Sequence, residues 1–128
     1  MKTIFTNGCF DVLHRGHFEL LKHCHSLGRV VVGVNTDSSI KRLKGADRPF
    51  FNEIDRAFML ECCQYVDEVI LFDDDTPYNL IKQIKPDIIV KGGDYKPSQV
   101  VGSDLSEVVI FNYIQGYSTS NTLAGVRK

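Results

Sequence analysis

Two histidines three residues apart, His14 and His17, are the side chains of this chain best suited to chemistry. The stretch Asn7-Gly8-Cys9-Phe10-Asp11 comes just before them, and Gly16 lies between them. Residues three apart share a face where the chain is helical, so both imidazoles can point at the same group. Imidazole N–H groups donate to phosphate oxygens, and main-chain N–H groups near glycines can approach a phosphate closely. The pattern therefore predicts a nucleotide phosphate site here.

Two alternative roles for the histidine pair stay open. The rings could cap a surface helix without binding anything, or Cys9, His14 and His17 could bind zinc. The glycine-containing stretch before the pair argues against simple caps. The spacing of the three residues does not fit a zinc site, and a fourth ligand is missing. The adjacent Cys62-Cys63 has no zinc spacing either, so we expect four reduced thiols, as is typical of a cytoplasmic protein. A redox or metal protein built on the cysteines is the weaker hypothesis.

The order of apolar segments predicts a scaffold that brings such residues together. Short runs rich in Val and Ile alternate with segments of helical periodicity. We predict strands at residues 2–6, 29–35, 66–72, 87–91 and 108–113, and helices at 17–27, after 36, at 53–65, at 77–85 and after 121. This alternation is typical of an α/β fold with a parallel sheet and right-handed crossovers. Length and the absence of a linker favour a single domain over residues 1–128.

Further polar residues follow the predicted strands. The carboxyl ends of parallel strands meet at one edge of a sheet, where ligands of open α/β sheets bind. From this placement we predict that the nucleotide site also contains Thr6, Asn35, Asp37, Lys91, Gly92, Asp94, Ser118, Thr119 and Ser120. The alternatives are an ordinary tight turn after residue 91 and ordinary helix caps at 118–120.

Basic residues after the second predicted strand are candidates for binding phosphates. Lys41, Arg42 and Lys44 come just before Gly45, where a mobile loop could close over a phosphate, with a solvated surface run as the alternative. Arg56 lies among apolar neighbours in a predicted helix. Because a guanidinium binds phosphate in a bidentate manner, we favour a phosphate role for Arg56 over an ion pair with an acidic neighbour in the same helix.

Acidic residues have two different interpretations. Asp11 is the preferred ligand for a ribose or a metal ion because it follows the glycine-containing stretch. The run Asp73-Asp74-Asp75 is interpreted as the acidic N-terminus of the next helix, where the helix dipole favours carboxylates.

The composition argues against several classes of partner. The net charge is −1, with 43% hydrophobic and 24% charged residues, values that are ordinary for a globular protein. This balance gives no reason to expect nucleic-acid binding. No apolar run approaches the roughly 20 residues that a membrane-spanning helix needs. We therefore expect neither nucleic acid nor membrane as a partner.

Taken together, these motifs resemble the nucleotidyltransferases of the His-x-Gly-His class. The resemblance covers nearly the whole chain and is carried by Thr6-Asn7-Gly8-Cys9-Phe10-Asp11, His14-Arg15-Gly16-His17, Val34-Asn35-Thr36-Asp37, Lys41-Arg42-Leu43-Lys44-Gly45, Arg48-Pro49, Arg56, Asp75-Thr76-Pro77, Lys91-Gly92-Gly93-Asp94-Tyr95-Lys96-Pro97 and Gly116-Tyr117-Ser118-Thr119-Ser120-Asn121. Within the class, the chain is most similar to the adenylyltransferase domains of ADP-heptose synthases.

The resemblance implies a fold and a reaction. The expected fold is α/β, a Rossmann-like open parallel five-stranded sheet with helices on both faces. The expected reaction transfers AMP from ATP to D-glycero-β-D-manno-heptose 1-phosphate for lipopolysaccharide or related glycan synthesis, with Mg²⁺ as cofactor and no metal ligands from the protein. His14, His17 and Lys44 take the catalytic role of binding the triphosphate. ATP and a sugar phosphate are the expected partners, together with a homodimer partner and a separate sugar kinase.

Two alternatives to this reaction remain. Glycerol-3-phosphate cytidylyltransferases share the His-x-Gly-His element and the late Gly-x-Ser-Thr turn, but their turn is preceded by Arg-Thr, where this chain has Tyr113 and Ile114. A nucleotide-binding regulatory module without turnover is the alternative outside the enzymes. The intact His14, His17 and Lys44 argue against it.

Overall fold

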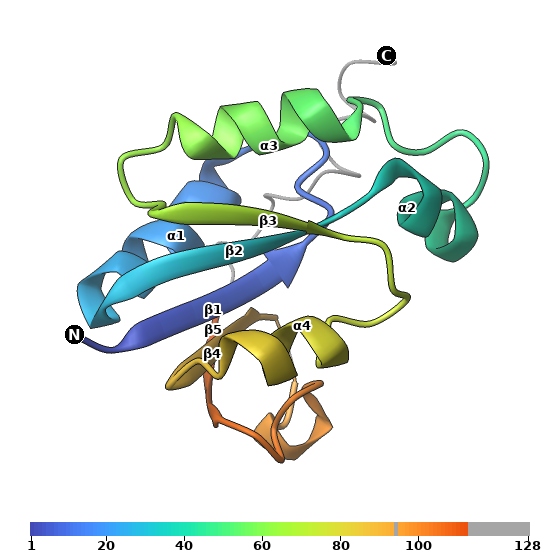
Figure 1. Cartoon of the computed structure of the whole chain (residues 1–128). Coiled ribbons are helices and arrows are strands. Elements are labelled where there is room, and N and C mark those ends of the chain that lie inside the picture. The colour runs from blue at the N-terminus through green and yellow to red at the C-terminus, as the bar shows by residue number, and fades with distance from the viewer. Residues whose placement is uncertain (94, 113–128) are drawn as a thin grey trace.

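The computed structural model describes residues 1–93 and 95–112. They form a five-stranded parallel sheet in the order β3-β2-β1-β4-β5. The strands are β1 Thr3–Gly8, β2 Arg29–Asn35, β3 Glu68–Phe72, β4 Ile88–Gly92 and β5 Glu107–Phe111. The helices are α1 Arg15–Leu27, α2 Asp37–Lys44, α3 Glu53–Glu61 and α4 Tyr78–Ile84, followed by the 3₁₀ turn η1 Pro97–Gln99. The predicted parallel α/β sheet is thereby confirmed (Figure 1).

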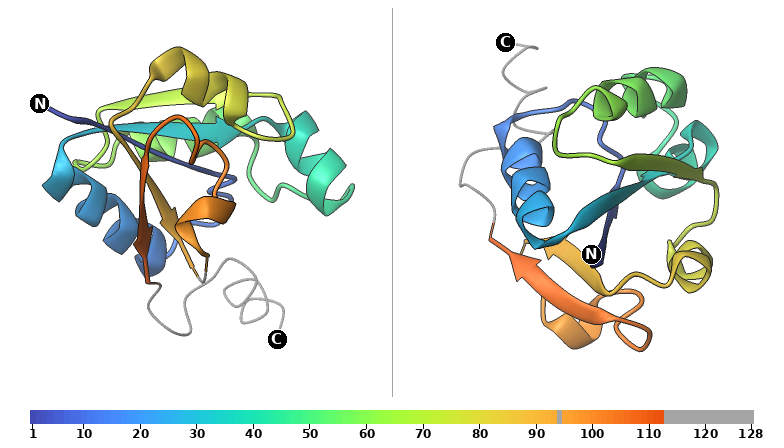
Figure 2. Two further views of the ribbon diagram at one scale, coloured as in Figure 1. Left: turned by 90° about the horizontal axis from the view of Figure 1, so that it is seen from below. Right: turned by 60° about the vertical axis from the view of Figure 1, so that its left-hand side comes forward.

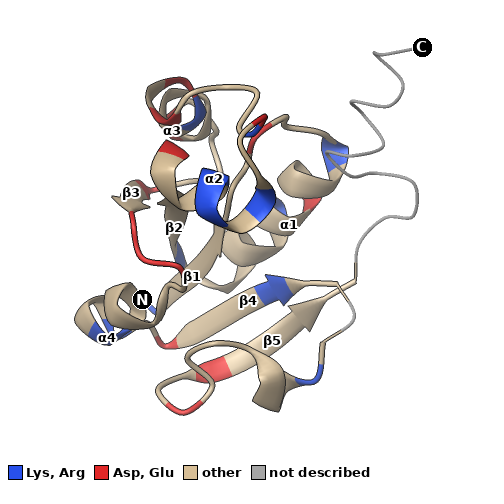
Figure 3. Cartoon of the chain, turned by 90° about the vertical axis from the view of Figure 1, so that its right-hand side faces the viewer, with Lys and Arg blue, Asp and Glu red and all other residues tan. Residues whose placement is uncertain are grey.

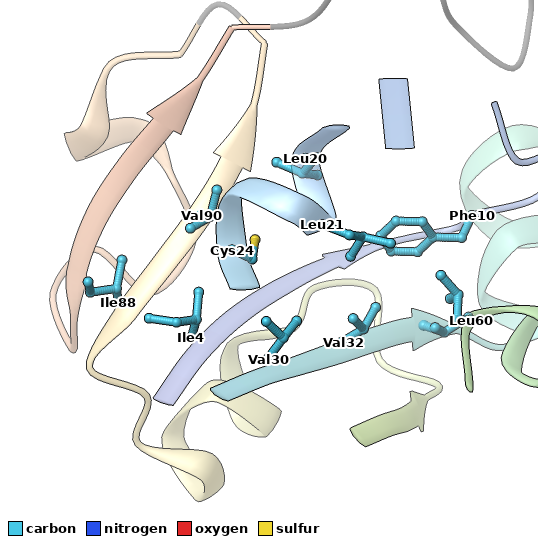
Figure 4. Packing of buried hydrophobic residues seen from close by; sticks show 11 residues of the cluster. Ile4, Phe10, Leu20, Leu21, Cys24, Val30, Val32, Leu60, Ile88 and Val90 are labelled. Carbon is cyan, nitrogen blue, oxygen red and sulfur yellow. The ribbon is translucent and has the colours of Figure 1, made fainter. Parts of the chain in front are cut away.

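Helices cover both faces of the sheet. On one face, Leu20, Leu21 and Cys24 of α1 pack with Leu60 of α3 against inward-facing residues of β1, β2 and β4 (Figure 4). On the other face, Ile81 of α4 packs with apolar residues of the sheet. The interior strand β2 is buried over six of its seven residues, as expected for a strand covered on both sides. The two views in Figure 2 show these layers from other directions.

The helix α2 takes a different position from the other helices. It follows β2 directly and lies beyond the carboxyl ends of the strands, where it faces the end of the sheet (Figure 1). Thr36 is its N-cap, with a side chain that accepts a hydrogen bond from Ser39 N–H. Lys41, Arg42 and Lys44 all belong to its last turn, a position that the helix dipole favours for cations. The predicted mobile basic loop is therefore wrong, because these residues are helical.

The pairing of β1 with β4 is short. β1 pairs with β2 over six residues, from Thr3 to Gly8, but with β4 only at Ile4–Ile88 and Phe5–Ile89. Beyond these two pairs the strands separate toward their carboxyl ends. Between β1 and β4 the order of the strands along the chain also reverses. In open α/β sheets this reversal is the place where ligands bind.

Candidate active site

A cavity of about 610 Å³ lies at the carboxyl ends of the strands. This volume lies within the usual range for small-molecule sites. It brings together twelve of the predicted site residues: Thr6, Asn7, Gly8, Cys9, Phe10, Asp11, His14, His17, Asn35, Lys44, Lys91 and Gly92. The carboxyl edge of the sheet thus collects residues from β1, β2, β4, α1 and α2, as the alternating pattern predicts.

The other eight predicted residues fall into two groups. Gly16, Asp37, Lys41 and Arg56 lie elsewhere in the described part of the chain. Asp94, Ser118, Thr119 and Ser120 lie outside the described residues, so their roles remain predictions. Conversely, the cavity contains residues that were not predicted as site residues, among them Leu43, Arg48, Asp75, Thr76, Tyr95 and Val101, although all but Val101 belong to the motifs quoted above.

The two histidines cap the N-terminus of α1 through their side chains. His14 is the N-cap, and its Nδ1 accepts a hydrogen bond of 3.0 Å from Gly16 N–H. His17, at the third helical position, accepts a 3.2 Å hydrogen bond on Nδ1 from His14 N–H. This is a capping box built from two imidazoles. Because each Nδ1 acts as an acceptor, each neutral ring carries its proton on Nε2. The capping alternative and the phosphate-binding hypothesis are therefore compatible.

Burial keeps the two imidazoles neutral. Burial, together with the nearby charges of His14 and Lys44, lowers the pKa of His17 to about 4. Partial burial also lowers the pKa of His14 below its usual value. At neutral pH both rings are thus hydrogen-bond donors through Nε2 and carry no charge of their own. The fixed positive charge near them comes from Lys44.

Phe10 fixes the turn that leads to the histidines. Its backbone has φ of 48°, a left-handed conformation that is unusual for an aromatic residue. The residue is 5% exposed and belongs to the main core cluster (Figure 4). Its ring centre lies 5.4 Å from that of His17. Burial of the aromatic ring offsets the cost of the strained backbone. Phe10 consequently connects the core to the position of His17.

Arg56 is completely buried and acts within the protein. Its guanidinium donates to the carbonyl oxygens of Cys9, Asn35 and Phe51 at 2.7–2.9 Å, and to Asp37 at 2.8 Å. It does not line the cavity. The sequence favoured a phosphate role for Arg56, with an ion pair inside α3 as the alternative. The ion pair in the structure is instead with Asp37 at the start of α2. The side chain thus joins the ends of β1 and β2 to the segment before α3, and so shapes the cavity from behind.

Asp11 anchors the loop between α2 and α3. Its two carboxylate oxygens accept hydrogen bonds from Phe50 N–H at 2.7 Å and Phe51 N–H at 2.8 Å. The residue is 3% exposed. These bonds occupy the carboxylate that we expected to serve a ribose or a metal ion. Among the described residues no group of three or more His, Cys, Asp or Glu side chains is arranged to hold a metal ion.

The acidic run after β3 contacts α2 and does not begin a helix. The helix α4 starts at Tyr78 with Pro77 as its N-cap and has no acidic residue in its first turn, so the predicted acidic helix N-terminus is wrong. Instead, Arg42 forms ion pairs with Asp73 and Asp75, and Thr36 donates a 2.5 Å hydrogen bond to Asp73. Figure 3 shows this acidic segment after β3 beside the basic helix α2. The contact places Asp75 at the edge of the cavity.

The opposite side of the cavity is formed by the end of β4. Lys91 and Gly92 line it there, and the Lys91 ammonium lies 5.1 Å from the centre of the Tyr95 ring. This is a cation–π distance. The histidine pair therefore shares its cavity with two lysines, Lys44 from α2 and Lys91 from β4.

Neutral imidazole donors, two lysines and main-chain N–H groups at the reversal point of a parallel sheet are suited to a chain of phosphates. Such a combination is suited to a nucleotidyltransferase, in which donors aimed at phosphate oxygens stabilise the charge that grows during transfer.

Comparison with known proteins agrees with this class. The model of the cytidylyltransferase-like family matches residues 5–124, and the chain belongs to this family. The bifunctional protein HldE of Nitratiruptor sp. is 52% identical over 128 residues, which cover 98% of this chain and 28% of that protein. The HldE protein of Helicobacter pylori strain J99 is 49% identical over 99% of this chain and 28% of its own length. The chain thus spans little more than a quarter of these relatives.

Solved structures show the same fold. The structure described as the lipopolysaccharide core biosynthesis protein from Thermoplasma volcanium GSS1 is 30% identical, with a TM-score of 0.74 over 92% of this chain and 99% of that chain. A protein of unknown function from Archaeoglobus fulgidus, 16% identical with a TM-score of 0.64, shares the fold. The predicted family, fold and enzyme class are therefore confirmed. No helix in the described part of the chain is long and apolar enough to span a membrane.

Proposed function

We propose that the protein transfers AMP from ATP to D-glycero-β-D-manno-heptose 1-phosphate, giving ADP-heptose and pyrophosphate. The observation that carries this proposal is the pair of neutral imidazoles that share one cavity with Lys44 and Lys91. The motif resemblance to ADP-heptose synthases supports the choice of substrates. So do the similarity to bifunctional HldE proteins and the lipopolysaccharide description of the Thermoplasma structure.

The proposed chemistry is one displacement at phosphorus. A phosphate oxygen of the sugar phosphate, already anionic at neutral pH, attacks the α-phosphorus of ATP. The new P–O bond forms while the bond from the α-phosphorus to the bridging oxygen breaks, and pyrophosphate leaves with the electron pair. No proton has to be removed, so no general base is required. Catalysis then depends on position and on stabilisation of negative charge.

The side chains have distinct parts in this scheme. The Nε2–H groups of His14 and His17 donate to phosphate oxygens whose charge grows during the displacement, because each Nδ1 is already occupied by a main-chain N–H. Lys44 binds the phosphates from the end of α2. Cys9, Gly8 and Thr6 line the same cavity and bring main-chain groups of β1 toward the nucleotide.

We propose that Mg²⁺ enters with ATP and is held mainly by its phosphates. In the described part of the chain the carboxylates that line the cavity are already engaged, Asp11 by two main-chain N–H groups and Asp75 by Arg42. These residues do not fit a protein-held metal centre, and the proposed mechanism uses none.

We also propose the setting of the reaction. A sugar kinase supplies the sugar 1-phosphate, in agreement with the word bifunctional in the names of much longer relatives. The four cysteines are free, which fits the reducing cytoplasm. A homodimer and a single nucleotidyltransferase domain over residues 1–128 remain further parts of this proposal.

A cytidylyl transfer to glycerol 3-phosphate is the second candidate, favoured by the description of the matching family. Both are tested by incubating the protein with each of ATP, CTP, GTP and UTP against heptose 1-phosphate, glycerol 3-phosphate and FMN, with Mg²⁺, and measuring pyrophosphate. We expect the highest rate with ATP and heptose 1-phosphate. A preference for CTP with glycerol 3-phosphate would replace the proposal by the second candidate.

A further inference from the structure

Arg48, in the loop between α2 and α3, lines the cavity. It belongs to the Arg48-Pro49 motif, but the sequence assigned it no role in the site. Its side chain is 20% exposed, so most of it is withdrawn from solvent. Within residues 1–93 and 95–112, its guanidinium has one partner, an oxygen of Asp11 at 3.4 Å. A contact of this length is weak, and an arginine has five N–H donors. Among the described residues, most of the N–H donors of this guanidinium therefore have no protein partner.

The partner of Arg48 does not depend on it. Asp11 already accepts two short hydrogen bonds from Phe50 N–H and Phe51 N–H, one on each oxygen. These bonds hold the loop to the end of β1 whether or not the arginine is present. Arg48 is therefore not the group that fixes the loop, and breaking its contact with Asp11 leaves the carboxylate with both of its main-chain donors.

The surroundings favour an anionic partner for Arg48. Lys44 lies at the other end of a short turn and lines the same cavity, so two cations converge there with the histidine pair. A guanidinium binds two phosphate oxygens at once and stays charged at every relevant pH. A partly buried cation with spare donors inside a phosphate-transfer cavity matches that use.

We propose that Arg48 binds a phosphate group during the transfer, and that it exchanges its long contact with Asp11 for two hydrogen bonds to phosphate oxygens. This inference rests on the proposed function, since it requires phosphates in the cavity. The phosphate belongs either to the triphosphate or to the acceptor. Both offer the same chemistry to a guanidinium, and binding measurements with each ligand separate them.

The test uses Arg48→Ala and Arg48→Lys, with Arg29→Ala as a matched control. Arg29 is an exposed arginine at the opposite end of β2 and pairs with Glu68 on the surface. Calorimetry gives the Kd of Mg²⁺-ATP and, separately, of heptose 1-phosphate and glycerol 3-phosphate. Urea unfolding of each variant checks that the fold is retained and corrects for any unfolded fraction.

We expect Arg48→Ala to raise the Kd of one class of ligand at least tenfold. An increase for ATP assigns Arg48 to the triphosphate, and an increase for a sugar or glycerol phosphate assigns it to the acceptor. Arg48→Lys, which keeps the charge but not the two-pronged geometry, should show a smaller increase, and Arg29→Ala none. Constants within twofold of the wild type for every ligand would overturn the proposal.

These measurements are independent of the acceptor that the enzyme finally uses. If heptose 1-phosphate neither binds nor reacts, the proposed substrate is wrong, yet the ATP and glycerol 3-phosphate measurements still decide the role of Arg48. Failure of the Arg48 inference, conversely, leaves the pyrophosphate assay of the wild type unaffected.

Discussion

The imidazole rings of His14 and His17 lie with their centres 3.9 Å apart, tilted by 31°, and each ring accepts a main-chain N–H of the turn that begins α1. The same atoms therefore cap the helix and determine which ring nitrogen carries the proton. Capping and catalysis depend on different nitrogens, Nδ1 and Nε2, and substitutions can separate them.

Replacement of either histidine by alanine should lower turnover by 10²-fold or more, the scale observed when one charge-stabilising donor is lost. His14→Ala also removes the N-cap and should cost about 1 kcal/mol of stability. His14→Asn is the informative variant, because its side-chain oxygen can take the place of Nδ1 while no Nε2–H remains. We expect stability close to the wild type and turnover as low as for alanine. Pyrophosphate release and urea unfolding measure the two effects, and full turnover in His14→Asn would contradict the mechanism.

The low pKa of His17 makes stability depend on pH in a defined direction. Its pKa is about 4 in the folded protein against 6.5 for an unperturbed histidine, so between these values the unfolded chain binds the proton more readily. The free energy of unfolding should therefore rise with pH up to about 6.5. As the pH falls from 6.5 toward 4, it should decrease by roughly 3 kcal/mol at most. Urea titrations at pH 7, 5.5 and 4.5 should show a shallower fall for His17→Asn than for the wild type. Parallel curves would refute the assignment.

Lys44 is expected to act mainly on ATP. It lines the cavity and its charge contributes to the low pKa of His17. Lys44→Ala should raise the KM for ATP about tenfold, with a smaller effect on stability, because the residue is exposed at the end of α2. Lys82→Ala, which removes an exposed lysine of α4 on the far side of the sheet, is the control. Steady-state kinetics at several ATP concentrations would exclude the assigned role if neither KM nor kcat changed.

Arg56 should be the most sensitive position for stability. Arg56→Ala removes a fully buried guanidinium and leaves three carbonyl oxygens and the partly exposed Asp37 without this donor. Loss of one partner of a buried ion pair costs about 3–5 kcal/mol, and we expect a loss of this order. Asp37→Asn should cost less, since its side chain is 30% exposed and an amide still accepts a hydrogen bond. Urea unfolding compares the two. A loss below about 1 kcal/mol for Arg56→Ala would show that the network is dispensable.

Local sequence signals gave the framework of the fold correctly. The valine-rich strand at 29–35 and the helix stop at Gly28 agree with the structure, because both depend on short-range chemistry. Helix ends were harder to place. The helix predicted to reach residue 65 ends at Glu61, and turns follow it before β3. Cys63 and Tyr65 continue the apolar pattern because they still pack against the core from those turns, whereas Cys62 is exposed.

The site was predictable where a motif lies at the end of a strand, as for His14, His17 and Lys91. It was not predictable where a contact distant in sequence decides the role. Arg56 meets the ends of β1 and β2, and Arg42 meets the acidic turn after β3, and no spacing within one segment indicates either contact. The role proposed for Arg48 is a similar case. It depends on Asp11, which is distant in sequence and is already bound by the main chain of another part of the loop.

The brief ladder between β1 and β4 has a consequence for how the protein responds to its nucleotide. Only two residue pairs join β1 to β4. We therefore expect local opening of the sheet to occur more readily between β1 and β4 than between β1 and β2 or between β4 and β5. A ligand that contacts both Thr6–Cys9 at the end of β1 and Lys91–Gly92 at the end of β4 would hold these two strands together. Saturation with ATP should then slow amide hydrogen exchange throughout β1 and β4, including residues that do not contact the nucleotide.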